Sequence, residues 1–579
     1  MSWRRFKIAS LVCSGVLLAA LTVIVCLCSP RPLAGRVDQI LRQAMMPGNK
    51  WEACMDELWA LGPDVIPCLA AEARRRDSPL SKSYLGLWWK LPPVLRRYLP
   101  ERIDRVELRR TAMRAIAEFG PLAARRAAPQ VIAGLGEGDD QSRHHAQQCV
   151  RWLLPASVSA LGTLERGLSG ASTDGSISRS LSVLKSLDGS VLAKMPRVVP
   201  LLTNHLRDAG HVYGAALVLS RFGSNAQAAL PALVQTLDMG AAGVFTDTET
   251  ARTQLAAAYS DPLGRHMAEV QEDDKQMNHN RAMAALALGR IGTATPEVRA
   301  ALVRGWNAPD AWVRRNAAEA VALLGSSMTN DLPGLLAGLM DHDNAALDKK
   351  LLAIGKIGPE ARCALVTLRK LTQASRLRSL VADPEAEVAG WTIEDLALSA
   401  KMAIGRIDPQ EARPFLPDIV KKIGYWWESV EFLVELCPLS NDVVRAVEPR
   451  LGQTETHWQS IAAYIILCHD NRHAKALEVL RQNESAGELN ERLLAGRLLF
   501  QSLGETNGMC SLIAEAVKAP ESFIGQSACQ IAEELGVAAL PALPAFKVAL
   551  WHKDRFVRER AGMLVIKLAP EEIPVNEAK

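Results

Sequence analysis

Apolar residues recur along most of this chain at the three-and-four spacing of an amphipathic helix, and the helical pattern itself repeats. Gly292, Gly325 and Gly358 each end an apolar run, and they follow one another at intervals of thirty-three residues. Asp310 and Asp343, at the turn within each unit, keep the same interval. A fixed period of this length is typical of a solenoid, in which each unit buries its apolar face against its neighbours.

The unit from Thr295 to Gly325 predicts a first helix, a short turn and a second helix. Pro296 suits the first position of a helix, because its missing N–H costs nothing there. Asp310 is placed to cap the second helix with its carboxylate, and Gly325 ends that helix. The offset of fifteen residues from this aspartate to the end of the unit recurs at Asp140, Asp174, Asp208, Asp310, Asp343 and Asp554.

The Asp-x-x-Val-Arg turn at Asp310, Val313 and Arg314, the alanine-rich second helix and the closing Leu-Gly resemble a HEAT repeat of the short, phycobilisome-lyase type. The resemblance implies an all-α protein, a right-handed α-solenoid (superhelix) of about fourteen helix-turn-helix repeats. It implies little about function, because such arrays serve as scaffolds, adaptors and occasionally enzymes. The turn recurs near the end of the chain at Asp554, Val557 and Arg558.

Residues 1–30 predict a membrane anchor. Arg4, Arg5 and Lys7 precede an uncharged run, 8–28, long enough at about 1.5 Å per residue to cross a hydrocarbon core of roughly 30 Å. A cleaved signal peptide is the alternative, but no Ala-x-Ala site closes the run. We therefore expect one uncleaved transmembrane helix, with the N-terminus in the cytoplasm and the solenoid on the far side. Cleavage would instead make the protein secreted or periplasmic. With this segment the chain resembles bacterial, membrane-anchored HEAT-repeat proteins.

The rest of the chain divides by composition. The acidic interruption of the period at 238–280 is either a degenerate repeat or an inserted loop, and both interpretations stay open. The interruption at 74–104 is basic and rich in tryptophan, so it would either lie at a lipid surface or form an inter-helix loop packed on the first repeats. The sequence predicts a tether at 31–50, a solenoid over 51–570 interrupted at about 74–104, 238–280 and 373–392, and a polar tail at 571–579.

We expect this array to bind a protein or peptide on its curved surface. Trp306 and Trp312 occupy positions in the apolar stripes and are predicted to lie in the core. The candidate contacts are aromatic and charged residues in the interruptions, and a Trp-Trp pair that cannot place both rings on one side of a helix. These candidate contacts are Trp88, Trp89, Arg96, Arg97, Trp426, Trp427, Asp273 and Asp274.

The sequence indicates no catalytic, cofactor or metal site. Its cysteines form no Cys-x-x-Cys pair, and those beyond residue 30 are predicted to be free thiols, most of them buried. His469 and His473 have helical spacing, but the residues between them predict a turn. There is no nucleophile motif such as Gly-x-Ser-x-Gly, and the net charge of +4 gives no reason to expect nucleic acid. We expect a membrane-anchored interaction scaffold that is not an enzyme. The alternative is an enzyme or small-molecule-binding protein, lyase-like for example, with a site assembled from distant repeats.

Overall fold

The described part of the chain is helical throughout, with α-helices and short 3₁₀ segments. The predicted anchor at 1–30 lies outside it, and so does part of each predicted interruption. None of the described helices combines the length and the apolar character that a membrane crossing requires. The computed structural model describes residues 32–576 except 47, 49, 76–87, 89–103, 136–139, 155, 170–175, 188, 209, 240–264, 342, 379–391, 424–426 and 507.

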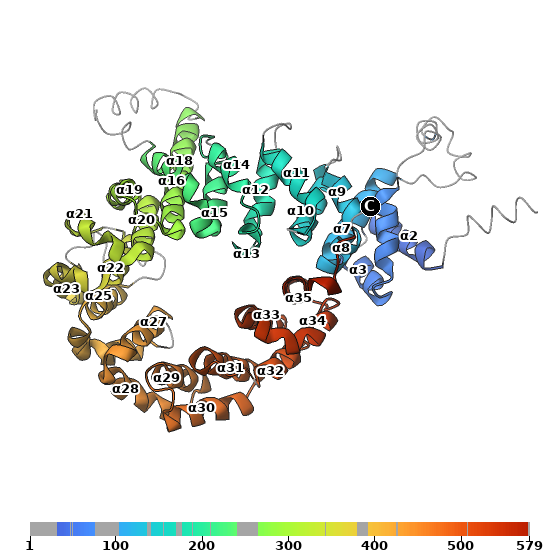
Figure 1. The fold of residues 1–579 in the computed structure, drawn as a ribbon. Helices are drawn as coiled ribbons and strands as arrows, with labels where there is room; N and C mark the ends of the chain where they lie inside the picture. Colours follow the sequence, from blue (N-terminus) through green and yellow to red (C-terminus); the bar gives the residue numbers. More distant parts are fainter. Residues whose placement is uncertain are drawn as a thin grey trace, which may run out of the picture. The chain divides into compact units, whose positions relative to one another are not determined.

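Two compact units make up the fold, and each is described by itself (Figure 1). Unit 1 combines Met1–Leu153 with Lys547–Lys579, so it contains segments from both ends of the sequence. Unit 2 is the continuous segment Leu154–Phe546.

Unit 2 is an array in which the second helix of each repeat packs against the second helix of the next. For example, α20 (Ala311–Leu324) contacts both α18 (Arg265–Ile291) and α22 (Asn344–Ile357). Because a first helix returns the chain between them, successive second helices run in the same direction. The other second helices are α12 (Ser176–Lys185), α15 (Val212–Phe222), α25 (Ile393–Ile407), α27 (Trp427–Leu436), α29 (Thr456–His469), α31 (Leu489–Leu503) and α33 (Ser522–Leu535).

The first helices of unit 2 are shorter, and 3₁₀ turns precede or follow several of them. The α-helices in this layer are α11 (Val158–Leu168), α14 (Val198–His205), α16 (Leu230–Asp238), α19 (Pro296–Trp306), α21 (Leu332–Ala337), α23 (Leu365–Leu371), α26 (Leu416–Lys421), α28 (Asn441–Val447), α30 (Ala474–Ser485), α32 (Met509–Ala516) and α34 (Leu543–Ala549). Short helices α13 (Gly189–Leu192) and α24 (Ala374–Arg378) join elements. The 3₁₀ segments are η1 (Gly223–Ala229), η2 (Gly325–Asp331), η3 (Gly358–Ala364), η5 (Pro409–Phe415), η6 (Cys437–Leu439), η7 (Glu448–Gly452) and η8 (Gly536–Ala542).

The predicted caps and helix ends set the register of the array. The carboxylate of Asp310 accepts a hydrogen bond from Val313 N at 3.1 Å and so begins α20. The helix ends at Gly325, where φ is +52°, and α22 ends at Gly358, where φ is +82°. Residues with a side chain are strained at such angles, which explains the glycines. Equivalent capping bonds are made by Asp343 and Asp554.

A buried ionic cluster joins neighbouring repeats between α20 and α22. Lys350 is 1% exposed, and its Nζ lies 3.0 Å from Asp341 Oδ2 and donates to Gly338 O at 2.7 Å. Arg314 donates to both oxygens of Asp341, at 2.6 and 2.8 Å. Trp306 donates from Nε1 to the same Gly338 oxygen at 3.0 Å and is fully buried, which confirms its predicted place in the core. Since each charge is paired, the cluster is structural.

The prediction of a tether at 31–50 is wrong for residues 32–44. Residues Pro32–Ala44 form the helix α2, in which Val37, Ile40 and Leu41 are buried. These side chains share one face because their spacing follows the helical period, and α2 packs on α3 (Trp51–Ala60) and α4 (Val65–Arg74). The prolines and glycines that suggested a tether flank this stripe.

The interruption predicted at 238–280 is shorter than expected. Asp238 ends α16 and binds the guanidinium of Arg304 through two hydrogen bonds of 2.9 and 2.7 Å. Residues from Arg265 onward belong to α18, which packs directly on α15. In the described residues no second helix of a further unit lies between α15 and α18, so the structure favours an insertion over a degenerate repeat.

Unit 1 brings the last helix against the first repeats. The helix α35 (Arg555–Leu568) packs on α7 (Arg105–Phe119) and α8 (Pro121–Arg126), as Figure 1 shows. Arg558, 4% exposed, donates to Glu118 O at 2.8 Å, and its Cζ lies 4.3 Å from the centre of the Trp59 ring. The unit also contains α9 (Ala128–Leu135), α10 (Asp140–Leu153) and η9 (Pro570–Glu572).

The start of the predicted polar tail also takes part in this packing. Ile573 is 1% exposed, and its carbonyl accepts a hydrogen bond of 2.7 Å from Arg125 Nη1. Asn576 N donates to Arg125 O at 3.0 Å. The predicted polar tail is therefore packed against α8 at Ile573 and Asn576.

Candidate functional site

The exposed aromatic side chains of the described residues share one structural position. All five lie at the first or second residue of a second helix. Trp312, Phe523 and Phe556 also lie thirteen residues before Gly325, Gly536 and Ala569, the residues that follow their helices. Single exposed aromatic residues are common on protein surfaces and need no explanation. Exposed aromatic residues that recur at one position of a repeat are instead typical of a contact surface. The five are Tyr213, Trp312, Trp427, Phe523 and Phe556.

Trp312 was predicted to lie in the core, and that prediction is wrong. Its side chain is 55% exposed. As the second residue of α20 it precedes the first buried residue, Val313, and so lies on the open side of the helix. Its ring centre is 6.0 Å from that of His279 on α18 and 5.5 Å from Arg315 Cζ. The ring therefore contacts His279 of the neighbouring repeat and still remains exposed to solvent.

We define the helix-start edge of unit 2 as the edge formed by Tyr213, Trp312, Trp427, Phe523 and the first residues of α29. These residues share an edge because the second helices run in one direction. Phe556 has the equivalent position in unit 1.

A cavity of about 470 Å³ opens on this edge. Val420 and Lys421 at the end of α26 form one wall with Ile423, while Arg450 and Gly452 of η7 form another. The remaining lining residues are Gln453, Thr454, Glu455 and Trp458. A volume of this size suits a few side chains of a peptide or a small molecule.

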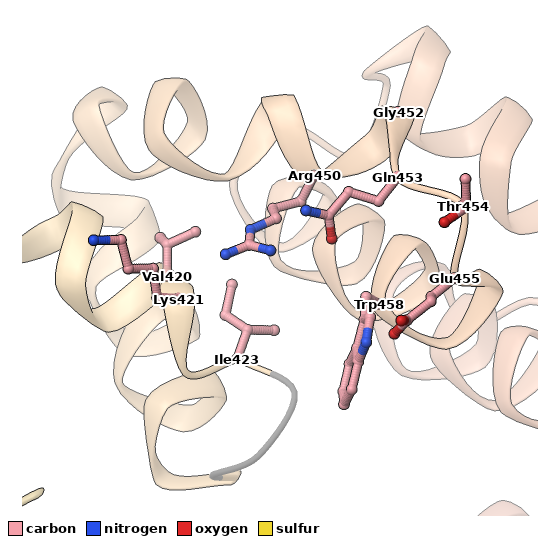
Figure 2. A pocket seen from close by; sticks show the side chains of 9 residues that line it. All are labelled: Val420, Lys421, Ile423, Arg450, Gly452, Gln453, Thr454, Glu455 and Trp458. Atoms are coloured by element: carbon pink, nitrogen blue, oxygen red, sulfur yellow. The ribbon is translucent and has the colours of Figure 1, made fainter.

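Side chains of both charges line the cavity. Figure 2 shows the guanidinium of Arg450 beside Ile423 and the Gln453 carboxamide, and the Glu455 carboxylate beside the Trp458 ring. The ammonium of Lys421 points away from the other lining groups. Arg450 is half-buried, yet no carboxylate of the described residues pairs with it, and Glu455 likewise has no cationic partner among them. The cavity thus offers the guanidinium of Arg450, the carboxylate of Glu455 and the apolar side chains of Val420 and Ile423.

A smaller cavity of about 200 Å³ lies between α22, α25 and α27. Its charged groups are Lys356, Arg406 and Glu435, and both cations pair with the one carboxylate. Arg406 Nε donates to Glu435 at 2.7 Å, and Lys356 also pairs with this carboxylate. Burial opposes ionisation of Glu435, but the two cations hold its pKa below the ordinary value. With its charges paired, this cavity is less suited to an ionic ligand.

Few of the contact residues predicted from the sequence belong to this site. Trp427 begins α27 and is 50% exposed, which confirms that the Trp-Trp pair exposes a ring. Trp88 is half-buried. Asp273 and Asp274 lie in the helix α18, and their side chains are outside the described residues. Trp89, Arg96, Arg97 and Trp426 also lie outside the described residues.

The cysteines and histidines follow the sequence predictions in part. All eight cysteines beyond residue 30 are free. Burial raises the pKa of the Cys437 thiol to about 12, as expected for an inert thiol, whereas Cys363 is exposed. His473 caps α30 by accepting a hydrogen bond from Ala476 N, which confirms a turn after His469.

Sequence reasoning missed Arg450, Glu455 and Trp458 because the C-terminal repeats are irregular. Register did contain a signal for Trp312 and Phe523. Each stands two residues after the N-cap residue of its second helix, before the first buried side chain of that helix. A search for large apolar residues at that position would have found the exposed aromatic series.

Comparisons with known proteins agree with the repeat architecture. Residues 271–355 match the family model of HEAT repeats. No curated protein matches the sequence. Similar solved structures include the karyopherin Kap121p bound to the extreme C-terminus of the protein phosphatase Cdc14p, with 12% identity, a TM-score of 0.41, and coverage of 93% of this chain and 72% of that one.

Two further solved structures are similar at the same low level. Importin beta has 12% identity and a TM-score of 0.38 over 96% of this chain and 91% of that one. The CpcE–CpcF complex of phycocyanin lyase from Nostoc sp. PCC7120 has 18% identity and a TM-score of 0.30 over 50% of this chain and 94% of that one. Residues 271–355 are therefore HEAT repeats, and they belong to an array of regular helical units.

Proposed function

We propose that this protein is a membrane-anchored interaction scaffold, and that it binds a peptide segment of a protein partner along the helix-start edge of unit 2. The observation that carries the proposal is the half-buried Arg450, which faces a cavity without a carboxylate partner among the described residues. A partly buried guanidinium gains most from a carboxylate that accepts two parallel N–H hydrogen bonds from it.

The lining groups define the peptide chemistry. An Asp or Glu side chain of the partner would bind Arg450, and a Lys or Arg side chain would bind Glu455 and lie against the Trp458 ring. Val420 and Ile423 supply the apolar surface between them. We therefore expect a segment with an acidic and a basic residue separated by an apolar one.

Exposed aromatic residues would extend this contact to neighbouring repeats. Aromatic side chains contribute large apolar area at low entropic cost, and they are enriched among residues that dominate binding. Trp312 and Phe523 lie on other repeats of the same edge. A folded partner would therefore contact more of the edge than a short peptide can.

The test selects peptides from a random displayed library on the full chain and measures their affinity by fluorescence anisotropy. Arg450→Gln should weaken the selected acidic peptides about 10- to 100-fold, the range of one charge-assisted bond. Arg445→Gln is the matched control, because Arg445 is exposed on α28 and bound to Asp442 outside the cavity. Equal affinities of the wild type and Arg450→Gln would exclude the cavity as the binding site.

We also propose that residues 8–28 hold the array at the extracytoplasmic side of a membrane. The support is the sequence pattern of leading positive charges before an uncharged run. Cys363, exposed on η3, provides the test. In intact cells a membrane-impermeant maleimide should label Cys363 in the wild type and leave Cys363→Ser with much weaker labelling. Labelling of Cys363 only after the cells are lysed would place the array in the cytoplasm.

A further inference from the structure

Two histidines and an aspartate meet at the turn between α14 and α15. His205 is the last residue of α14, His211 immediately precedes α15, and Asp208 lies between them in the turn. One donor atom from each side chain lies within 4.8 Å of the other two. The turn brings the three together although no pair of them has the i, i+4 spacing of a helical metal site.

Asp208 departs from the role that its register position predicts. Asp310, Asp343 and Asp554, at the same offset, cap their second helices. Asp208 does not cap α15. Its Oδ1 accepts from Gly210 N at 3.1 Å, and its Oδ2 lies 2.6 Å from His211 Nδ1. The carboxylate that caps a helix elsewhere in the array here faces an imidazole.

Neighbouring repeats orient both imidazoles. His205 Nε2 lies 2.6 Å from the carbonyl oxygen of Leu168, so this nitrogen donates and Nδ1 keeps its lone pair. His211 Nε2 lies 3.0 Å from Ser178 Oγ. A hydrogen bond from one ring nitrogen to a carbonyl is the arrangement that fixes metal-binding histidines.

From this geometry we propose that His205, Asp208 and His211 form a binding site for a divalent transition-metal ion, with Zn²⁺ as the best match. Two imidazoles and a carboxylate suit zinc, and three protein ligands leave the fourth tetrahedral position for water or a ligand from another molecule.

The consequence for the fold would be local. The metal would join the end of α14 to the start of α15, and so fix the turn that precedes the exposed Tyr213.

The test is equilibrium dialysis of the chelator-stripped full chain against Zn²⁺, with bound zinc counted by elemental analysis. Because cysteines elsewhere can bind zinc, the readout is the difference between variants. We expect His205→Ala and His211→Ala each to lose one equivalent of zinc, or to bind it at least tenfold more weakly. His144→Ala is the matched control, because His144 is an exposed histidine on α10 and belongs to unit 1.

A third variant, Asp208→Asn, tests the site while keeping the turn folded, because its amide oxygen can still accept the hydrogen bond from Gly210 N. Its zinc affinity should also fall, while its circular dichroism matches the wild type. Replacing Zn²⁺ by Co²⁺ should give a visible spectrum of a tetrahedral site that disappears in Asp208→Asn. Equal zinc stoichiometry and affinity in the wild type, His205→Ala, His211→Ala and Asp208→Asn would overturn the proposal.

Discussion

At the scale of single residues, two buried carboxyl groups of this array differ in the form that stabilises the fold. Asp341 is paired with Arg314 and Lys350, and those hydrogen bonds hold its pKa below the ordinary value although burial opposes ionisation. Asp348 accepts a hydrogen bond from the Ser399 hydroxyl, 2.6 Å from its Oδ1, and burial raises its pKa to about 6. The first carboxylate stabilises the fold in its charged form, and the second in its neutral form.

Asp348 should therefore make the array less stable as the pH rises. Its pKa is about 6 in the folded chain against 3.8 in the unfolded one, so its stabilising effect is complete below pH 3.8 and is lost as the pH passes 6. Asp348→Asn, neutral at every pH, should stabilise the α22–α25 region by about 2–3 kcal/mol at pH 7.5 and by little at pH 4.

Hydrogen exchange of α22 and α25 amides at both pH values measures the effect of Asp348→Asn. Asp395→Asn is the control of opposite sign. Burial opposes ionisation of Asp395, but Thr392 and Lys422 lower its pKa, so its neutral substitute should destabilise at pH 7.5. If Asp348→Asn destabilises the region at pH 7.5 as Asp395→Asn does, Asp348 is an ionised structural carboxylate and the prediction is wrong.

At the scale of helices, the sequence determined the repeat and its register, and it predicted the caps at Asp310, Asp343 and Asp554. The apolar period of a helix and the glycine at its end follow from local chemistry, so Asp310 and Gly325 could be placed without a structure. The helix α2 was missed because a short stripe between prolines and glycines resembles a linker in composition.

The site was harder to predict, since it depends on neighbours in space. Trp312 fits the apolar pattern of its helix, and only its position before the first buried turn exposes it. Arg450 and Glu455 belong to different elements, and their charges matter because no partner among the described residues neutralises them. Sequence shows neither which charges are paired nor which residues share a cavity.

The ends of α16 and α18 limit the deletion that can test the insertion between them. Removal of 238–280 would delete the carboxylate that binds Arg304 and the first part of α18. Removal of 241–264 would spare both. A deletion that tests the insertion for partner binding should stay within these limits, so that loss of binding does not reflect loss of the array.

At the scale of the whole molecule, unit 1 depends on residues from both ends of the sequence. The rings of Trp59, Phe119 and Trp551 pack with centroid distances of 4.3, 4.4 and 5.1 Å. Burial lowers the pKa of Arg125 and of Arg558 to about 10, and both stay charged at neutral pH. Their carbonyl partners compensate for that burial.

Gly562 offers a direct test of this packing. A side chain at Gly562, on α35, would overlap the ring of Pro121 on α8. Gly562→Val should therefore destabilise unit 1 by about 1–3 kcal/mol, the usual cost of overpacking, and speed hydrogen exchange in α7 and α8. The control is Gly162→Val on α11, where an added Cβ meets nothing within 4 Å. Unchanged exchange in α7 and α8 of Gly562→Val would show that α35 does not support them.

The contact between Arg125 and Ile573 spans 448 residues of sequence, which has a consequence for biosynthesis. The ribosome releases Trp59 and Phe119 long before it makes Trp551, so the nascent chain carries an unfinished apolar surface for most of its synthesis. A chaperone that covers this surface would have to release it only after Trp551 has been synthesised. A product truncated by a premature stop codon would keep it exposed, and cellular quality control could recognise that product as incomplete.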